Sequence, residues 1–127
     1  MGNWLNRPQS IEGYEGFVYL IKNNLDGRQY IGKKTFWKRR TLKPLKGKKR
    51  KRRTVTESEW KDYYGSSNKL NEDIKTYGKN NFTRTILNCY KSKFEVSYHE
   101  AREQFERQVL LTDRYYNELI RVRLHKR

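Results

Sequence analysis

Cysteine and histidine are scarce in this sequence of 127 residues. Cys89 is the single cysteine, so the chain cannot form an intramolecular disulfide or a cysteine-based zinc site. His99 and His125 are the only histidines, which excludes a histidine-rich metal centre. The chain also has no HExxH motif and no P-loop, so zinc-protease chemistry and P-loop nucleotide binding have no basis in the sequence.

Long hydrophobic runs are also lacking. No stretch of about 18 consecutive apolar residues occurs, and the first ten residues, MGNWLNRPQS, have no apolar core of a signal peptide. Hydrophobic residues make up only 34% of the chain, partly offset by 10 Tyr, 5 Phe and 3 Trp that can each bury a large area. We therefore expect one small, soluble, cytoplasmic domain with no membrane partner.

Acidic residues are outnumbered, because 14 Asp and Glu face 30 Lys and Arg and leave a formal net charge of +16. Such an excess favours a polyanionic partner, most simply nucleic acid. The segment 38–53 holds eleven of the basic residues and no acidic one. Because these charges repel one another, and Pro44 and Gly47 oppose a helix, we expect a basic insert at about 38–55 that is extended or mobile when free.

The hydrophobic pattern predicts three strands. Residues 16–22 (GFVYLIK) and 28–33 (RQYIGK) are β-rich, and the turn between them contains Asn, Asp and Gly, so they predict a β-hairpin. Residues 81–90 (NFTRTILNCY) predict a third strand, whereas residues 1–15 show no period and predict an irregular N-terminal arm. The tail after residue 112 is expected to add at most a short strand or helix.

Two helices are predicted between and after these strands, with a short one near Trp60. The first is capped by Ser67 and ends at Gly78, with one face made by Leu70, Ile74 and Tyr77. The second spans 97–111, with a capping box formed by Ser97 and Glu100 and an apolar face of Tyr98, Ala101, Phe105 and Val109. Residues 16–127 are thus expected to form a single α+β domain, a small, mainly antiparallel three-stranded sheet flanked by helices.

Five ordered segments of the chain resemble the GIY-YIG nuclease superfamily. They are VYLI at 18–21, YIGKK at 30–34, LNEDIKTYGKNNFTRTIL at 70–87, YHE at 98–100 and YYN at 115–117. With the basic insert, they look most like the catalytic domains of Seg-type phage endonucleases. The resemblance implies a phage-encoded, homing-endonuclease-like enzyme that cuts double-stranded DNA in the host cytoplasm with Mg²⁺ or Mn²⁺.

The resemblance also assigns roles to particular residues. Tyr30 would be the general base or polarise the attacking water, Tyr19 would support it, and Glu100 would be the metal ligand. Arg40 would stabilise the scissile phosphate, with Arg39 as its immediate rival. Further DNA contacts are expected from Lys33, Lys34, Arg39, Lys48, Lys49, Arg50, Lys51, Arg52, Arg53 and Asn117. The histidine that the family often carries after this arginine falls near Pro44 and is missing here.

Simpler interpretations compete with these roles. Tyr19 and Tyr30 could be ordinary packed residues of a hairpin, and Glu100 could serve simply as a helix cap. Glu103 and Glu106 are alternatives to Glu100 as the functional glutamate on the helical wheel. The whole chain could instead be a non-catalytic, basic nucleic-acid-binding protein on a nuclease-like scaffold. The sequence leaves open whether the protein is a monomer or a dimer, which site it cuts, and whether the chain is complete or an isolated domain.

Overall fold

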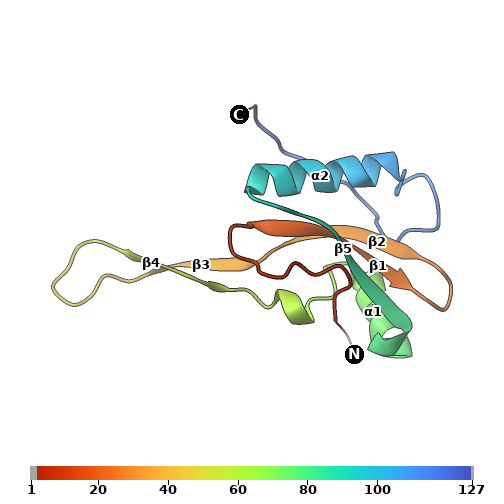
Figure 1. The fold of residues 1–127 in the computed structure, drawn as a ribbon, viewed down its shortest axis with the longest axis horizontal. Helices are drawn as coiled ribbons and strands as arrows, with labels where there is room; N and C mark the ends of the chain where they lie inside the picture. Colours follow the sequence, from red (N-terminus) through yellow and green to blue (C-terminus); the bar gives the residue numbers. More distant parts are fainter. Residues whose placement is uncertain (1–2, 127) are drawn as a thin grey trace.

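The predicted hairpin and third strand form one antiparallel sheet with the order β2-β1-β5. The structure, a computed structural model, describes residues 3–126. Its elements follow in the order β1 (Gly16–Asn23), β2 (Gln29–Thr35), β3 (Trp37–Leu42), β4 (Arg52–Glu57), a 3₁₀ turn at Trp60–Asp62, α1 (Asn68–Tyr77), a second 3₁₀ turn at Lys79–Asn81, β5 (Phe82–Tyr90) and α2 (Lys93–Glu106). This is the α+β fold predicted from the sequence, with α1 and α2 on opposite sides of the sheet (Figure 1).

The turn between β1 and β2 has the chemistry that its sequence predicts. Gly27 adopts a φ of 83°, a backbone conformation that residues with a Cβ atom rarely adopt. The Oδ1 atom of Asn23 accepts the main-chain N–H of Leu25, and Asp26 accepts that of Arg28. This tight turn sets the register in which Tyr19 of β1 lies opposite Gly32 of β2.

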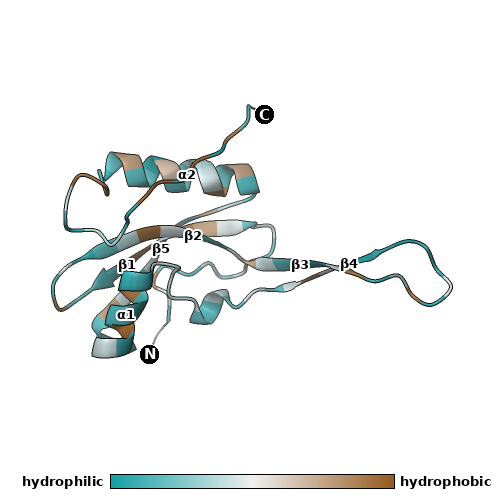
Figure 2. Ribbon diagram, turned by 180° about the vertical axis from the view of Figure 1, so that it is seen from behind, coloured by the Kyte–Doolittle hydropathy of each residue, from teal (hydrophilic) through white to brown (hydrophobic). Residues whose placement is uncertain are grey.

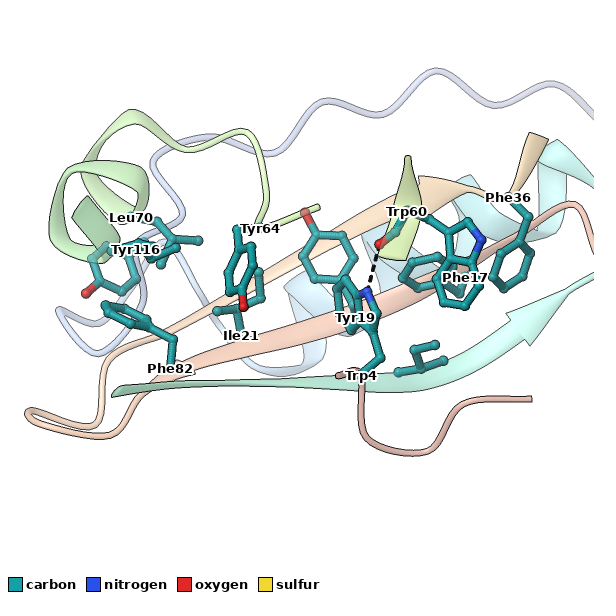
Figure 3. Packing of buried hydrophobic residues seen from close by; sticks show 12 residues of the cluster. Trp4, Phe17, Tyr19, Ile21, Phe36, Trp60, Tyr64, Leu70, Phe82 and Tyr116 are labelled. Carbon is teal, nitrogen blue, oxygen red and sulfur yellow. Dashed lines mark hydrogen bonds between the residues drawn. The ribbon is translucent and has the colours of Figure 1, made fainter. Parts of the chain in front are cut away.

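Alternation along β1 divides the core between the two faces of the sheet. Phe17, Tyr19 and Ile21 point to the α1 side, where they pack with Trp4, Phe36 and Trp60 in an aromatic cluster (Figure 3). Val18 points to the other side, toward Ile31 and Val109. Strand β2 is an edge strand of this sheet, so side chains from both faces of the sheet lie along its outer edge.

The N-terminal arm is irregular, as expected, but its residues belong to the core. The side chain of Trp4 is only 3% exposed, and its Nε1 atom donates to the main-chain oxygen of Trp60 at 2.8 Å (Figure 3). Leu5 forms an isolated bridge with Thr85 of β5. Aromatic residues from distant segments thus compensate for the low hydrophobic content of the chain.

Helix α1 confirms its predicted ends, and two of the three residues of its predicted face are buried. Ser67 is the N-cap and its side chain accepts the N–H of Leu70, and Gly78 follows the helix with a φ of 89°. Leu70 and Ile74 are buried, but Tyr77 is 49% exposed. Tyr77 is the last residue of the helix.

The prediction for α2 was wrong at both ends and for its apolar face, because the helix spans Lys93–Glu106 and not 97–111. Ser92, not Ser97, is the N-cap: its side chain accepts the N–H of Glu95 and donates to the Glu95 carboxylate, so the capping box begins five residues earlier. Tyr98 and Phe105, expected in the core, are 48% and 62% exposed. The buried residues of α2 are Val96, Ala101 and Gln104.

The basic insert forms a β-hairpin, so its strands are extended, as its charge suggested, but are paired with each other. Strands β3 and β4 pair from Trp37↔Glu57 to Leu42↔Arg52, and the hairpin projects from the sheet (Figure 1). Across this register, every Lys or Arg of either strand lies opposite a neutral residue, so the strands pair without a direct like-charge contact. The β-branched run Thr54, Val55 and Thr56 further favours a strand.

Candidate active site

The two tyrosines of the first hairpin share one face of the sheet. Tyr19 is 1% exposed, and its ring lies across Gly32, so a Cβ atom there would sit 2.6 Å from the Cζ atom of Tyr19. The ring centroids of Tyr19 and Tyr30 are 6.2 Å apart. Burial raises the pKa of Tyr19 well above its usual value, and neighbouring Tyr63 and Tyr30 raise it further. Tyr19 is therefore a protonated, buried residue beneath Tyr30.

Tyr30 opens into a cavity of about 690 Å³ on the outer edge of β2. Its Oη atom lies 3.3 Å from the Oγ atom of Ser66, which precedes α1. Burial raises the pKa of Tyr30; the hydrogen bond to Ser66 lowers it, and neighbouring Tyr63 and Glu100 raise it. The Tyr30 side chain is only partly buried, so its hydroxyl can meet a molecule that enters the cavity.

Glu100 lines the same cavity from helix α2. Its side chain is 14% exposed, and its Oε1 atom lies 3.9 Å from the Nζ atom of Lys33, which also donates to Ser97 at 2.9 Å. Burial raises the pKa of the Glu100 carboxyl, and the positive charge of Lys33 opposes that rise. Lys33 and Glu100 therefore form a partly shielded pair beside the Tyr30 hydroxyl.

The helical wheel contained the signal that selects Glu100, although the predicted apolar face hid it. Val96, Glu100 and Gln104 are spaced by four residues, so they lie on one side of α2. Val96 and Gln104 are buried against the sheet, and this places Glu100 on the covered side. Glu106, by contrast, forms an exposed ion pair with Arg102, and Glu103 pairs with Arg107.

The C-terminal tail lines the cavity and binds the edge of β2 through main-chain bonds to Gln29 and through the side chain of Asn117. Asn117 is 8% exposed; its Oδ1 atom accepts the N–H of Ile31 at 3.1 Å and its Nδ2 atom donates to the Ile31 carbonyl at 2.9 Å. Gln104 of α2 donates to the same carbonyl at 3.1 Å. Asn117, expected to contact DNA, thus lies in the cavity wall with both amide groups engaged by the main chain.

The predicted arginines lie away from this cavity. Arg39 on β3 forms a bidentate pair with Glu15, with both N–O distances at 2.8 Å. Arg40 is exposed on the opposite face of the same hairpin and is not among the described residues that line the cavity. The cations that line it are Lys33 and Arg121. Sequence reasoning missed Arg121 because only the course of the tail brings it to β2.

The other residues predicted to contact DNA fall into two groups, Lys34 at the end of β2 and the cations of the β3–β4 hairpin. Lys34 points away from Lys33, pairs with Glu59 and lies over the ring of Tyr63, with its Nζ atom 4.4 Å from the ring centroid. Six cations lie exposed in the loop and first residues of β4, namely Lys48, Lys49, Arg50, Lys51, Arg52 and Arg53. They form a surface that is separate from the cavity.

The side chains of the cavity fit a divalent cation bound mainly by one carboxylate. Glu100 is the shielded carboxylate, and Glu118, which is 62% exposed and 3.8 Å from Lys69, stands at the rim. No group of three or more potential ligands (His, Cys, Asp or Glu) occurs in residues 3–126. Mg²⁺ commonly keeps several waters and uses one or two carboxylates together with substrate phosphates, which suits this donor set.

No helix within the described part of the chain is long and apolar enough to cross a membrane. A family profile described as "Putative endonuclease segE, GIY-YIG domain" matches residues 4–120. The protein of the same name from Enterobacteria phage T4 is 31% identical to this chain over 101 residues. That match covers 80% of this chain but 39% of the phage protein, so the chain spans well under half of its relative's length. No solved structure matches the chain.

Proposed function

Because the chain belongs to the SegE-type family of GIY-YIG endonuclease domains, we propose that it hydrolyses phosphodiester bonds of duplex DNA with a divalent metal. The observation that carries this proposal is the shared cavity of Tyr30 from β2 and Glu100 from α2. A tyrosine hydroxyl, a shielded carboxylate and two cations in one cleft are the groups that phosphodiester hydrolysis requires. A packed hairpin alone would give no reason for Glu100 to face Tyr30.

Each residue has a distinct role in this proposal. The Tyr30 hydroxyl binds and orients the attacking water; because its pKa is raised, it acts as a hydrogen-bonding phenol near neutral pH. Lys33 and Arg121 face the negative charge that develops on the phosphate. Glu100 would hold Mg²⁺ or Mn²⁺, which supplies positive charge for the phosphate and the leaving oxygen. Tyr19 supports the ring of Tyr30 from below.

The buried charge of Glu100 also supports a role as a metal ligand. A carboxylate held in a low-dielectric wall with one cation 3.9 Å away is incompletely compensated. The Glu100 carboxylate would be more fully compensated if it held a divalent cation, and the Lys33 ammonium would then be free to face the phosphate. Lys33 would then exchange one anionic partner for another during substrate binding.

Cleavage of supercoiled plasmid DNA tests the proposal directly. The parent protein should nick or linearise the plasmid with Mg²⁺ or Mn²⁺ and leave it intact with EDTA. Tyr30→Phe should lower the cleavage rate by ~10²-fold, because the attacking water loses the hydroxyl that binds and orients it. Glu100→Gln should remove the metal-dependent activity. Tyr77→Phe and Glu72→Gln are matched controls on the exposed side of α1 and should cleave like the parent.

Two outcomes would contradict this proposal. Full activity of both Tyr30→Phe and Glu100→Gln would show that the cavity is not the catalytic centre. Salt-sensitive DNA binding without cleavage under any divalent metal would favour a non-catalytic binding protein on the same scaffold.

A further inference from the structure

The β3–β4 hairpin has two faces with different surroundings. Residues directly opposite in an antiparallel pair share a face, so Trp37, Arg39 and Val55 lie on one side and Arg40, Arg52 and Thr54 on the other. The first side is bound to the domain: the Nε1 atom of Trp37 donates to the Tyr14 carbonyl at 2.8 Å, and Arg39 pairs with Glu15. On the second side, Arg40 and Arg52 are exposed and Thr54 is half-buried, along the part of the hairpin that projects from the sheet (Figure 1).

The base of the hairpin is firmly anchored. Phe36, between β2 and β3, is fully buried, with its ring centroid 4.9 Å from that of Phe17 and 5.0 Å from that of Trp60. The Phe36 carbonyl accepts the N–H of Ser58 at 2.7 Å, and the Ser58 hydroxyl donates to the Thr35 carbonyl at 2.7 Å. The hairpin therefore leaves the domain in a defined direction, directly after the strand that carries Tyr30.

Positive charge is concentrated beyond this base. The Arg52 guanidinium donates to the Lys43 carbonyl at 3.4 Å. The loop 43–51 contains six Lys or Arg among its nine residues, and the whole hairpin appears mainly hydrophilic in Figure 2. Within the described chain, Lys38 and Arg39 have carboxylate partners, whereas none lies within 4 Å of the cations from Arg40 to Arg53. A protein surface this rich in uncompensated charge matches a polyanion.

We propose that this hairpin is a β-ribbon that binds duplex DNA by lying in the major groove. Its free face, with Arg40, Arg52 and Thr54, would face the base edges, and the cations of the loop would contact the flanking phosphates. This inference rests on the proposed function for its choice of duplex DNA as partner. Arg and Thr side chains can hydrogen-bond to base edges in the major groove. Binding to phosphates alone would need only positive charge, which lysines could supply.

Dimensions favour the major groove over the other grooves of nucleic acids. Two paired strands lie ~5 Å apart, so with side chains the ribbon suits a groove of ~12 Å and is too wide for a minor groove of ~6 Å. The major groove of A-form RNA is too narrow for such a ribbon. The ribbon would thus distinguish duplex DNA from duplex RNA, and its anchored base would determine which phosphate reaches the cavity.

Methylation protection by dimethyl sulfate, in EDTA so that no cleavage intervenes, tests the groove. The reagent modifies guanine N7 in the major groove and adenine N3 in the minor groove. The parent protein at saturation should protect N7 and leave N3 reactive. The double variant Arg40→Gln/Arg52→Gln should lose the N7 protection and bind duplex DNA at least ~10-fold more weakly. Its urea unfolding midpoint should match the parent's, because both side chains are exposed.

The double variant Lys22→Gln/Lys75→Gln is the matched control, because it removes the same charge from exposed positions on β1 and α1. It should retain the N7 protection. Equal losses of affinity in the two double variants, or protection of N3 instead of N7, would overturn the ribbon and leave only non-specific phosphate binding. Plasmid cleavage is scored separately: intact metal-dependent cleavage with no N7 protection refutes the ribbon alone, and N7 protection without cleavage refutes the enzyme alone.

Discussion

Asn117→Ala should destabilise the domain more than its position in a C-terminal tail suggests. In the parent, the Asn117 amide acts as a short substitute for a neighbouring strand on the edge of β2, with one bond to each main-chain group of Ile31. Ile31 is fully buried, so water has little access to the N–H group that the substitution exposes. The tail itself stays attached, because Tyr116 and Arg114 pair with the main chain of Gln29.

The expected magnitude follows from counting partners. Removing Asn117 leaves the Ile31 N–H without an acceptor, which costs ~1–3 kcal/mol for a buried donor, whereas the Ile31 carbonyl keeps the bond from Gln104. Gln104→Ala is the matched control, since it removes one of two donors to that carbonyl and orphans nothing. Its loss should be near ~1 kcal/mol.

Urea unfolding followed by tryptophan fluorescence measures both free energies of unfolding. Plasmid cleavage measured on the same samples reports whether a displaced Ile31 also displaces its neighbour Tyr30. A loss smaller for Asn117→Ala than for Gln104→Ala would refute the reasoning. It would mean that the tail does not hold the edge of β2 in solution.

Three further predictions concern the cavity and the strands beneath it. Glu100→Gln should be more stable than the parent at neutral pH, with the difference shrinking in acid. Burial raises the pKa of the Glu100 carboxyl in the folded state. This contributes stability to the parent below the unfolded pKa of ~4.3, and the parent loses that stability as the pH rises through the folded pKa. Urea unfolding across this pH range measures the difference in the free energy of unfolding. Mg²⁺ should raise the melting temperature of the parent and leave that of Glu100→Gln unchanged. Gly32→Ala should lower cleavage and stability together, because its Cβ would displace the ring of Tyr19 and with it Tyr30; a Gly13→Ala control, with open space at its Cβ, should show only the backbone strain of its positive φ.

The elements that sequence reasoning predicted well are those whose signals are local. The β1–β2 hairpin depends on a turn of Asn, Asp and Gly, and α1 depends on a cap at Ser67 and a stop at Gly78. Each of these signals acts within a few residues, so no knowledge of the rest of the fold is needed. The pairing of Tyr19 with Gly32 then follows from the turn.

The errors arose where two local signals competed and tertiary packing chose between them. Both Ser92 and Ser97 begin a plausible capping box, and the chain uses the first because α2 enters directly from β5. The aromatic spacing of Tyr98 and Phe105 suggested an apolar face, yet the sheet covers the side that carries Val96 and Gln104. In a basic chain rich in aromatic residues, the spacing of apolar residues in a helix does not predict which face will pack against the sheet.

The basic insert shows the same limit for charge. Composition alone predicted self-repulsion, but the two strands of the hairpin avoid direct like-charge pairs through their register. Whether Lys38, Arg40 and Arg52 face a neutral residue or another cation depends on a pairing that composition does not contain. Anchoring at Phe36 and Trp37 then gives the hairpin its direction.

The amino-acid sequence by itself determined the α+β class, the strands that carry the two tyrosines and the residue types that the proposed chemistry uses, because these depend on local propensity and composition. Tertiary structure alone decided that Glu100 faces Tyr30, that Arg121 reaches the cavity and that Arg40 lies on a separate hairpin. These relations join segments that are far apart in the chain. They follow from which surfaces are buried when the sheet, α2 and the tail pack together, and no local pattern specifies that.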